Sequence, residues 1–348
     1  MSEIKITSVQ QFVEQVAMLE LKENHTRFFR GHPDSEYEMI PSIYRDNSLI
    51  NNEDRIVKDV LTECAEYFLP HEMLFDKLVR MQHYNCPTRL LDVSYNALVG
   101  LYFAISNSKD ELKDKNDGEV IIFDIPSDEI KYHDSDTVAI LSALSLRDKN
   151  FEIKSIYDFS EQQAKISEAI CMINNHNSNH NYRQENFDNI LQDIMLDAGY
   201  EKPKDLLKAV CKKTFNQTLN QVFNEDERIV SLLNDIRKDK PYFLPNINPD
   251  DLEKVVCVKT KFNNPRIVHQ QGAFLIFGIK DRKTEQPIVK SGWIVAGETA
   301  SIRLIVDKEH KDFILNELKS FGISHQTLFP ELDKQASHIV KRHKENQK

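Results

Sequence analysis

The apolar segments that read as β-strands fall in two blocks, and a long polar stretch separates them. The first block lies near residues 26–125, where the runs 26–31 (TRFFRG) and 118–125 (GEVIIFDI) have the short apolar character of buried strands. The second block lies near residues 254–307 and holds apolar runs at 254–262, 272–279 and 300–308. A sheet must therefore draw strands from both ends of the chain. This pattern predicts an α+β fold with a mixed β-sheet core and flanking helices.

The polar stretch between the blocks has helical spacing from about residue 155 to 240, which predicts a helical insertion. The chain then divides into a first part of the domain (1–154), the insertion (155–240) and a second part (241–348). An Asn- and His-rich segment at 174–186 (NNHNSNHNYRQEN) lies within the insertion. Asparagine favours turns and the histidines lack nearby carboxylate ligands, so this segment predicts a solvated loop between helices rather than a metal site.

Helices are also expected in both parts of the domain. One covers residues 8–20, where Ser8 is suited to the N-cap. Another begins near Glu53, is interrupted at Pro70 and resumes over residues 71–84. Two more helices are expected at 95–107 and at 310–323, the second closing on Gly322.

Charge and cysteine content disfavour several classes of protein. The 348-residue chain has a formal net charge of −10 with acidic and basic residues intermixed, which disfavours wrapping duplex DNA through phosphate contacts. Its five cysteines form no CxxC pair, as expected in a reducing cytoplasm. No apolar run reaches the roughly 18 residues of a membrane span, and the N-terminus lacks the pattern of a signal peptide. We expect a cytoplasmic protein without a membrane partner.

Arg30 and Gly31, in the segment 27–45 (RFFRGHPDSEYEMIPSIYR), are the first candidate ligand-binding residues. A guanidinium offers a rigid fork of donors to phosphate or carboxylate, and a neighbouring glycine lets a ligand approach the backbone. Arg45 is a second candidate cation in the same segment. The alternative is that Arg30 pairs with Asp92 inside the fold and that Gly31 serves only a turn.

A second motif, residues 82–92 (QHYNCPTRLLD), concentrates polar side chains on a loop before an apolar helix. Its hydroxyl, imidazole and amide groups can contact a base or a ribose, and its arginine can contact phosphate. The alternative is a polar network that locks the loop onto the sheet, because buried polar groups must find partners. The candidate ligand-binding residues are Gln82, His83, Tyr84, Thr88, Arg89 and Asp92.

A third motif, residues 266–274 (RIVHQQGAF), places Arg266, Gln270 and Gln271 before Gly272. Glutamine can orient a water or a sugar hydroxyl, although it is a poor general base. The alternative is the start of a strand with a β-bulge at Gly272. If the three motifs serve one site, their residues must converge in the folded chain.

The three motifs together resemble the FRG domain family, named for its Phe-Arg-Gly sequence. The first carries Phe29-Arg30-Gly31, the second carries Gln-His-Tyr and Pro-Thr-Arg-Leu-Leu-Asp within residues 81–104, and the third lies within 263–278. A weaker similarity covers 324–340. The order matches, and only the helical insertion falls outside the resemblance. Val93 stands where family members often carry a tryptophan.

The order of the motifs resembles, more distantly, that of ADP-ribosyltransferases, which use NAD. The resemblance implies that Arg30 holds the dinucleotide phosphate and that Tyr84 or Thr88 lines the nicotinamide side. It places Gln270 or Gln271 at the third position, where those enzymes carry a glutamate. A neutral glutamine supplies no charge to stabilise the ribose cation that forms as nicotinamide leaves.

These motifs support more than one hypothesis about function. The first is an ADP-ribosyltransferase-like enzyme with NAD as its cofactor and no metal, in which Glu298 is an alternative source of the missing charge. The second is a non-catalytic module that senses a ligand or binds a protein, and a nucleic-acid-processing role is a further alternative. The expected partners are a small nucleotide-like ligand and a protein or nucleic-acid target. Since FRG family members are often encoded by bacteria or phages, the resemblance implies a role in bacterial stress or anti-phage defence.

Overall fold

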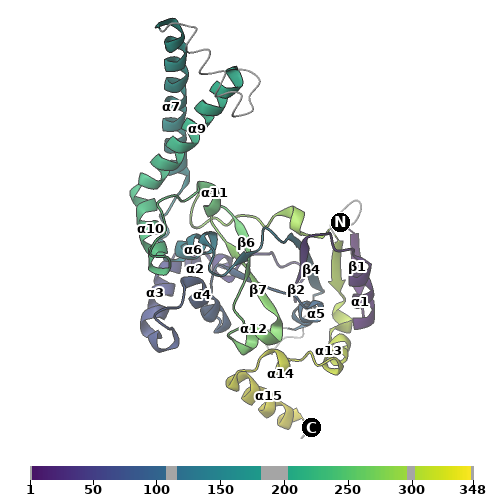
Figure 1. Cartoon of the computed structure of the whole chain (residues 1–348). Helices are drawn as coiled ribbons and strands as arrows, with labels where there is room; N and C mark the ends of the chain where they lie inside the picture. The colour runs from purple at the N-terminus through teal and green to yellow at the C-terminus, as the bar shows by residue number, and fades with distance from the viewer. Residues whose placement is uncertain (1, 107–115, 182–202, 296–301, 346–348) are drawn as a thin grey trace.

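The computed structural model of the chain describes residues 2–106, 116–181, 203–295 and 302–345. Figure 1 shows a central sheet with helices packed around it and a helical hairpin that projects from the body. The sheet has eight strands in the order β1-β8-β4-β2-β3-β7-β6-β5. The pairs β1–β8 and β5–β6 are parallel and the others are antiparallel, so the predicted α+β fold with a mixed sheet is confirmed.

The sheet contains strands from both ends of the chain, as the two apolar blocks predicted. The central pair β2 and β3 comes from the first block, and β7 and β6 of the second block continue the sheet beyond β3. Two strands, β1 and β5, were not predicted; β5 is too short to leave a periodic pattern. The strands are β1 (Ser2–Ile6), β2 (His25–His32), β3 (Leu90–Ser94), β4 (Gly118–Pro126), β5 (Lys131–Tyr132), β6 (Val255–Lys259), β7 (Gly272–Phe277) and β8 (Ile302–Val306).

The expected helices of the domain are present, and their ends follow from local chemistry. The helix α1 (Val9–Met18) begins after Ser8, whose side chain accepts a hydrogen bond from the Gln11 backbone N–H. The helix α13 (Lys311–Ser320) is followed by Gly322 at φ 77°, a left-handed conformation that glycine adopts without strain. The other predicted helices are α3 (Glu53–Glu63), α4 (Leu74–His83) and α5 (Ala97–Ile105).

Several further helices, most of them short, were not assigned from the sequence. They are α2 (Asn47–Ile50), α6 (Asp136–Ala143), α11 (Pro249–Leu252), α12 (Pro265–Gln270), α14 (His325–Leu328) and α15 (Leu332–Glu345).

Within the described residues, the region of the predicted insertion is helical and contains α7 (Lys154–Asn181), α9 (Pro203–Glu225) and α10 (Glu227–Asp239). The base of the hairpin and α10 join the core through Ile156, Phe223 and Ile229, whereas the far part of α7 and α9 extends away from the sheet (Figure 1). The prediction of a loop at 174–186 is wrong for its first eight residues, because α7 continues to Asn181. The remainder, 182–186, lies outside the described residues.

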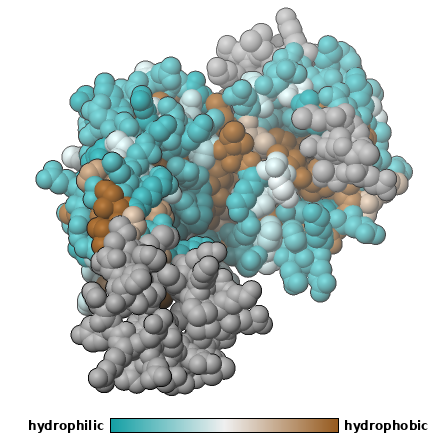
Figure 2. All heavy atoms as spheres, turned by 90° about the horizontal axis from the view of Figure 1, so that it is seen from above, coloured by the Kyte–Doolittle hydropathy of each residue, from teal (hydrophilic) through white to brown (hydrophobic). Residues whose placement is uncertain are grey.

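The two faces of the sheet are covered differently. Phe29 of β2 lies opposite Ser94 of β3, so the side chains of residues 29, 31, 92 and 94 share one face, which α4, α5 and α6 cover. The other face carries Phe28, Leu91 and Val93, and loop residues such as Tyr44 and Trp293 cover it. On the face of the molecule seen in Figure 2, hydrophobic residues gather in a band between two mainly hydrophilic regions.

Gly31 allows α5 to lie directly against β2. A Cβ atom at Gly31 would approach the Gly100 carbonyl oxygen to 2.1 Å and the Ala104 nitrogen to 2.3 Å, both of them backbone atoms that cannot swing aside. The glycine of the Phe-Arg-Gly sequence therefore has a packing role on the helix-covered face, not a turn role.

We expect Gly31→Ala to lower the free energy of unfolding by about 3 kcal/mol or more, because α5 must shift away from the strand. Gly292→Ala is the matched control, since nothing lies within 4 Å of an added Cβ there, and its effect should stay below about 1 kcal/mol. Urea unfolding of both variants measures the difference. Equal stability of the two variants would contradict this account of the motif glycine.

Candidate functional site

The sheet opens between the end of β2 and the start of β3, and Arg30 fills the opening. The β2–β3 ladder consists of one residue pair, Phe29 with Ser94. If the ladder continued, Gly31 would lie opposite Asp92. Because it does not, the Asp92 carbonyl has no backbone hydrogen bond from β2. Arg30 supplies the missing donor, with Nη1 2.7 Å from the Asp92 carbonyl oxygen. The alternative of an Arg30–Asp92 contact inside the fold is therefore present, but Arg30 binds the backbone oxygen of Asp92 and not its carboxylate.

His32 orients the Arg30 guanidinium from the other side. Arg30 Nε donates to His32 Nε2 at 2.9 Å, and His32 is 1% exposed. Burial, followed by the charges of Arg30 and Arg45, lowers the pKa of His32 to about 3, and the Tyr37 backbone opposes this shift. The imidazole is therefore neutral near pH 7, and because Nε2 accepts, Nδ1 carries the proton. Nδ1 is buried without a hydrogen bond of normal geometry.

The guanidinium of Arg30 keeps one free edge. Its Nη2 makes no hydrogen bond within the described part of the chain, and the arginine is only partly buried. Burial lowers the pKa of Arg30 to about 10; the Asp92 charge raises it and the Arg45 charge lowers it. The group remains cationic near pH 7.

Arg45 is an exposed second cation near Arg30. Its Nη2 donates to the Ile40 carbonyl at 3.4 Å, a long bond. Among residues with described placement, neither Arg30 nor Arg45 has a carboxylate within 4.0 Å. Tyr37, 53% exposed, meets the His32 ring edge-on with 6.4 Å between ring centroids. The result is a local concentration of unpaired positive charge on an acidic protein.

The second motif forms a network that holds the opening in shape. Gln82 Nε2 donates to Asp92 Oδ2 at 2.8 Å and to the Leu90 carbonyl at 3.2 Å, while Gln82 Oε1 accepts from the Thr88 hydroxyl. Thr88 is fully buried, and its oxygen also accepts from the Leu90 backbone N–H. This is the alternative that the sequence left open, a polar network locking the loop onto the sheet.

Arg89 lies in the core and not in the site. Its Nε and Nη2 donate to the Glu53 carboxylate, with Nε 2.9 Å from Oε1, and its Nη1 donates to the Phe277 carbonyl at 3.0 Å. Both charged side chains are fully buried, and Lys283 lies 3.3 Å from Glu53. The predicted phosphate contact of Arg89 is therefore replaced by a structural ion pair. Burial lowers the pKa of Lys283 to about 8, against the opposing effect of Glu53.

The third motif packs against the end of α4. Arg266 Nη1 donates to the His83 carbonyl at 2.9 Å, and Asn264 contacts His83 Nδ1 at 2.9 Å. Arg266 also lies over the Phe329 ring at 4.6 Å. Burial, and next the Arg266 charge, lowers the pKa of His83 to about 4. These residues join the domain to the segment before α15.

The two glutamines of the third motif stabilise the turn that leads into β7. Gln270 Nε2 donates to the Leu328 carbonyl at 3.1 Å. The Gln271 carbonyl accepts from the Tyr95 backbone N–H, and Gln271 has a left-handed backbone at φ 45°. No bulge is needed at Gly272, which pairs with Ser94 in the regular β3–β7 ladder.

The structure thus brings some predicted site residues together and separates others. Arg30, Asp92, Gln82 and Thr88 form one hydrogen-bonded group, with Arg45 near it. Tyr84 is instead 68% exposed and lies beside Tyr67. Glu298 lies outside the described residues. His32 was not among the predicted site residues, although strand alternation places its side chain on the same face as that of Arg30.

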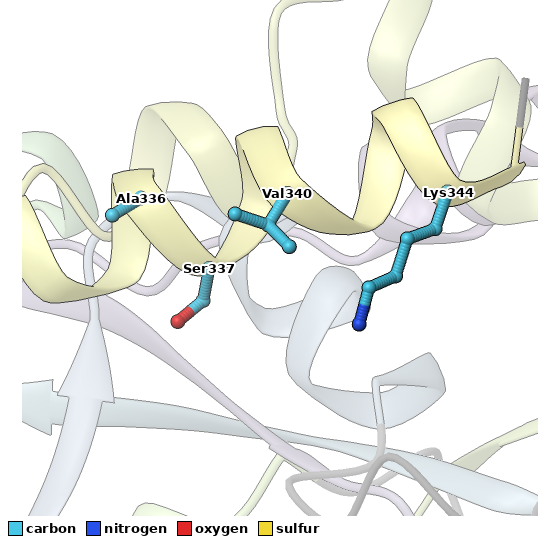
Figure 3. A pocket seen from close by; sticks show the side chains of 4 residues that line it. All are labelled: Ala336, Ser337, Val340 and Lys344. Carbon is cyan, nitrogen blue, oxygen red and sulfur yellow. The ribbon is translucent and has the colours of Figure 1, made fainter.

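Two surface hollows lie away from this group. One runs along α15 and is lined by Ala336, Ser337, Val340 and Lys344 (Figure 3). Another lies beside Asp136 and residues 240–246. Within the described residues, no cluster of His, Cys, Asp or Glu has the arrangement of a metal site.

Residues 25–113 match the family model of the FRG domain. The chain contains an FRG domain. The match begins at β2, includes the first two motifs and extends beyond α5, whereas the third motif meets the FRG domain through the β3–β7 ladder. No match was found among curated proteins or among solved structures. Of the helices with described placement, none has both the length and the apolar character required to cross a membrane.

We expect Glu53→Gln to lower the free energy of unfolding by about 3–5 kcal/mol, because Arg89 and Lys283 then remain buried without a counter-charge. Asp251→Asn, which removes a pair with the half-exposed Lys254, is the control and should cost less than about 1 kcal/mol. Urea unfolding tests both. A loss below about 1 kcal/mol for Glu53→Gln would contradict the structural role of the buried pair.

The lowered pKa of His32 predicts a pH dependence of stability. Below about pH 6.5 the unfolded chain binds a proton at this histidine, whereas the folded chain does not until about pH 3. Stability should therefore fall as the pH drops through this window, by up to about 1.4 kcal/mol per pH unit for this group. His32→Gln, which keeps an acceptor for Arg30, should make the slope shallower between pH 6.5 and 4.5. Exposed His71→Gln is the control and should leave the wild-type slope unchanged.

Proposed function

We propose that the FRG domain binds a phosphate-bearing, nucleotide-like anion at Arg30 and Arg45, as a ligand-sensing module. The observation that carries the proposal is the state of Arg30. Two hydrogen bonds fix its guanidinium, its Nη2 is left without a hydrogen bond, and no carboxylate within the described part of the chain lies within 4.0 Å of it. A fixed guanidinium loses little entropy when it meets a planar or tetrahedral oxyanion.

The surroundings of Arg30 favour an anion over a cation or an apolar ligand. Arg45 adds a second positive charge at the exposed side, and the neutral His32 places no negative charge nearby. Burial is the main cause of the lowered pKa values of Arg30 and His32, and repulsion from neighbouring arginines lowers both further. A bound phosphate would relieve this repulsion. The formal net charge of the whole chain is −10. The chain as a whole therefore repels an anion, and only the charges at the site attract it.

The ADP-ribosyltransferase alternative has less support in the arrangement of the residues. It requires Thr88 or Tyr84 beside the nicotinamide, yet Thr88 is fully buried in the Gln82 network and Tyr84 lies beside Tyr67. Gln271 carries no charge for an oxocarbenium-like state. NAD is therefore proposed as one ligand to test, and a protein or nucleic-acid target and a role in bacterial stress or anti-phage defence stay predictions.

We expect Arg45→Ala to weaken anion binding by about 1.5–3 kcal/mol, or roughly 10- to 150-fold in Kd, the range for a charge-assisted hydrogen bond. Its stability should stay close to wild type, because the side chain is exposed and makes one long hydrogen bond. Isothermal titration with pyrophosphate, ADP and NAD measures the effect. Arg282→Ala, a 63% exposed arginine on another part of the chain, is the matched control and should bind as wild type does.

Arg30→Lys provides a second test, with a melting curve measured on the same sample. It keeps the charge but loses the fork, so binding should weaken by a similar amount, together with some stability from the lost Asp92 contact. Equal affinity of wild type and Arg45→Ala, or no binding of any of the three ligands, would contradict the proposal. Release of nicotinamide from NAD by wild type or by Gln271→Glu would instead support the transferase hypothesis.

A further inference from the structure

Two cysteines face each other across the projecting hairpin. Cys171 of α7 and Cys211 of α9 are 40 positions apart in the chain, yet their sulfur atoms lie 3.2 Å apart. Both are thiols in this structure. A disulfide needs a sulfur–sulfur distance of about 2.05 Å, so a movement of roughly 1 Å would join them.

We propose that Cys171 and Cys211 are a redox pair whose reversible disulfide fastens α7 to α9. The inference concerns the hairpin and does not depend on the anion site. It would add a modification site to a part of the molecule that the Phe-Arg-Gly motifs do not reach.

The packing of the hairpin sets this pairing. One helical turn before Cys171, Ser167 meets Thr218 of α9 with 3.2 Å between the hydroxyl oxygens, in the same antiparallel register. Small side chains such as Ser160 and Ala164 are fully buried along this stretch of α7, which allows two helices to approach closely. The contact between Ser167 and Thr218 therefore holds the two helices, and with them the cysteines, in one register.

The two thiols differ in exposure, which suggests an order of reaction. Cys171 is half-buried and Cys211 is fully buried, and burial raises the pKa of Cys211 to about 11. With hydrogen peroxide as oxidant, Cys171 attacks the peroxide and forms a sulfenic acid with release of water. The sulfur of Cys211 then attacks the sulfenic sulfur and expels the second water. The sum, two thiols and one peroxide to one disulfide and two waters, balances.

The disulfide would close a loop of about 40 residues and restrict the opening of the hairpin. Without it, the hairpin can separate at its far end at a cost set only by the contacts of α7 with α9. Oxidation should therefore slow proteolytic cleavage within the hairpin by about tenfold or more, the lower end of the effect expected for such a cross-link.

The experiment exposes the full-length protein to hydrogen peroxide, blocks remaining thiols with N-ethylmaleimide and maps the peptides by mass spectrometry. We expect a linked Cys171–Cys211 peptide pair, a loss of two of the five thiols, recovery of both with dithiothreitol, and slower proteolysis of the hairpin only in the oxidised form. Cys64→Ser, at an exposed thiol elsewhere, should behave as wild type.

Cys171→Ser and Cys211→Ala should each abolish the linked peptide and the protection from proteolysis, and their melting curves before oxidation show whether the hairpin still folds. The proposal is overturned by a wild-type protein that forms a Cys64–Cys86 link, a bond between two chains or a sulfinic acid at Cys171 in place of the Cys171–Cys211 peptide. Equal protection of the oxidised wild type and of Cys171→Ser would overturn it as well.

Discussion

The buried ion pair between Arg89 and Glu53 is the interaction on which the arrangement of the domain depends. Arg89 directly precedes β3, Glu53 begins α3, and the same arginine binds the carbonyl at the end of β7. Lys283 adds a third charge from beyond β7. One group of side chains therefore joins both blocks of the sheet to a helix. Such a group gives little net stability compared with an apolar core of the same shape, but it strongly penalises any arrangement that leaves one charge unpaired.

The same constraint explains why the candidate site is open. The ion pair holds β3 against α3 and β7. The start of β3 diverges from the end of β2, and the β2–β3 ladder has only one residue pair. Arg30 then satisfies the Asp92 carbonyl that the missing ladder leaves free. Its position is a consequence of the sheet geometry, and its free edge is what the proposed anion would meet.

Residues 30 and 31 have separate tasks because strand neighbours point to opposite faces. Gly31 faces α5 and removes the Cβ that would collide with its backbone. Arg30 faces the loop-covered side, with His32 and Arg45. A short sequence motif can thus combine a packing requirement with a binding function. Substitution of Gly31 should lower stability, whereas substitution of Arg30 should mainly weaken binding of the proposed anion.

Periodicity and cap residues determined the α+β class, most strands and the helix ends at Ser8 and Gly322, because these depend on neighbours in the chain. The presence of two motifs of the FRG domain was also readable from local sequence. Only the tertiary structure decided that Arg89 belongs to the core and that Arg30 is unpaired, since their partners are far away in sequence. Residues 174–181 are another case in which local sequence was insufficient. Their asparagines favour a turn, but they belong to the long helix α7.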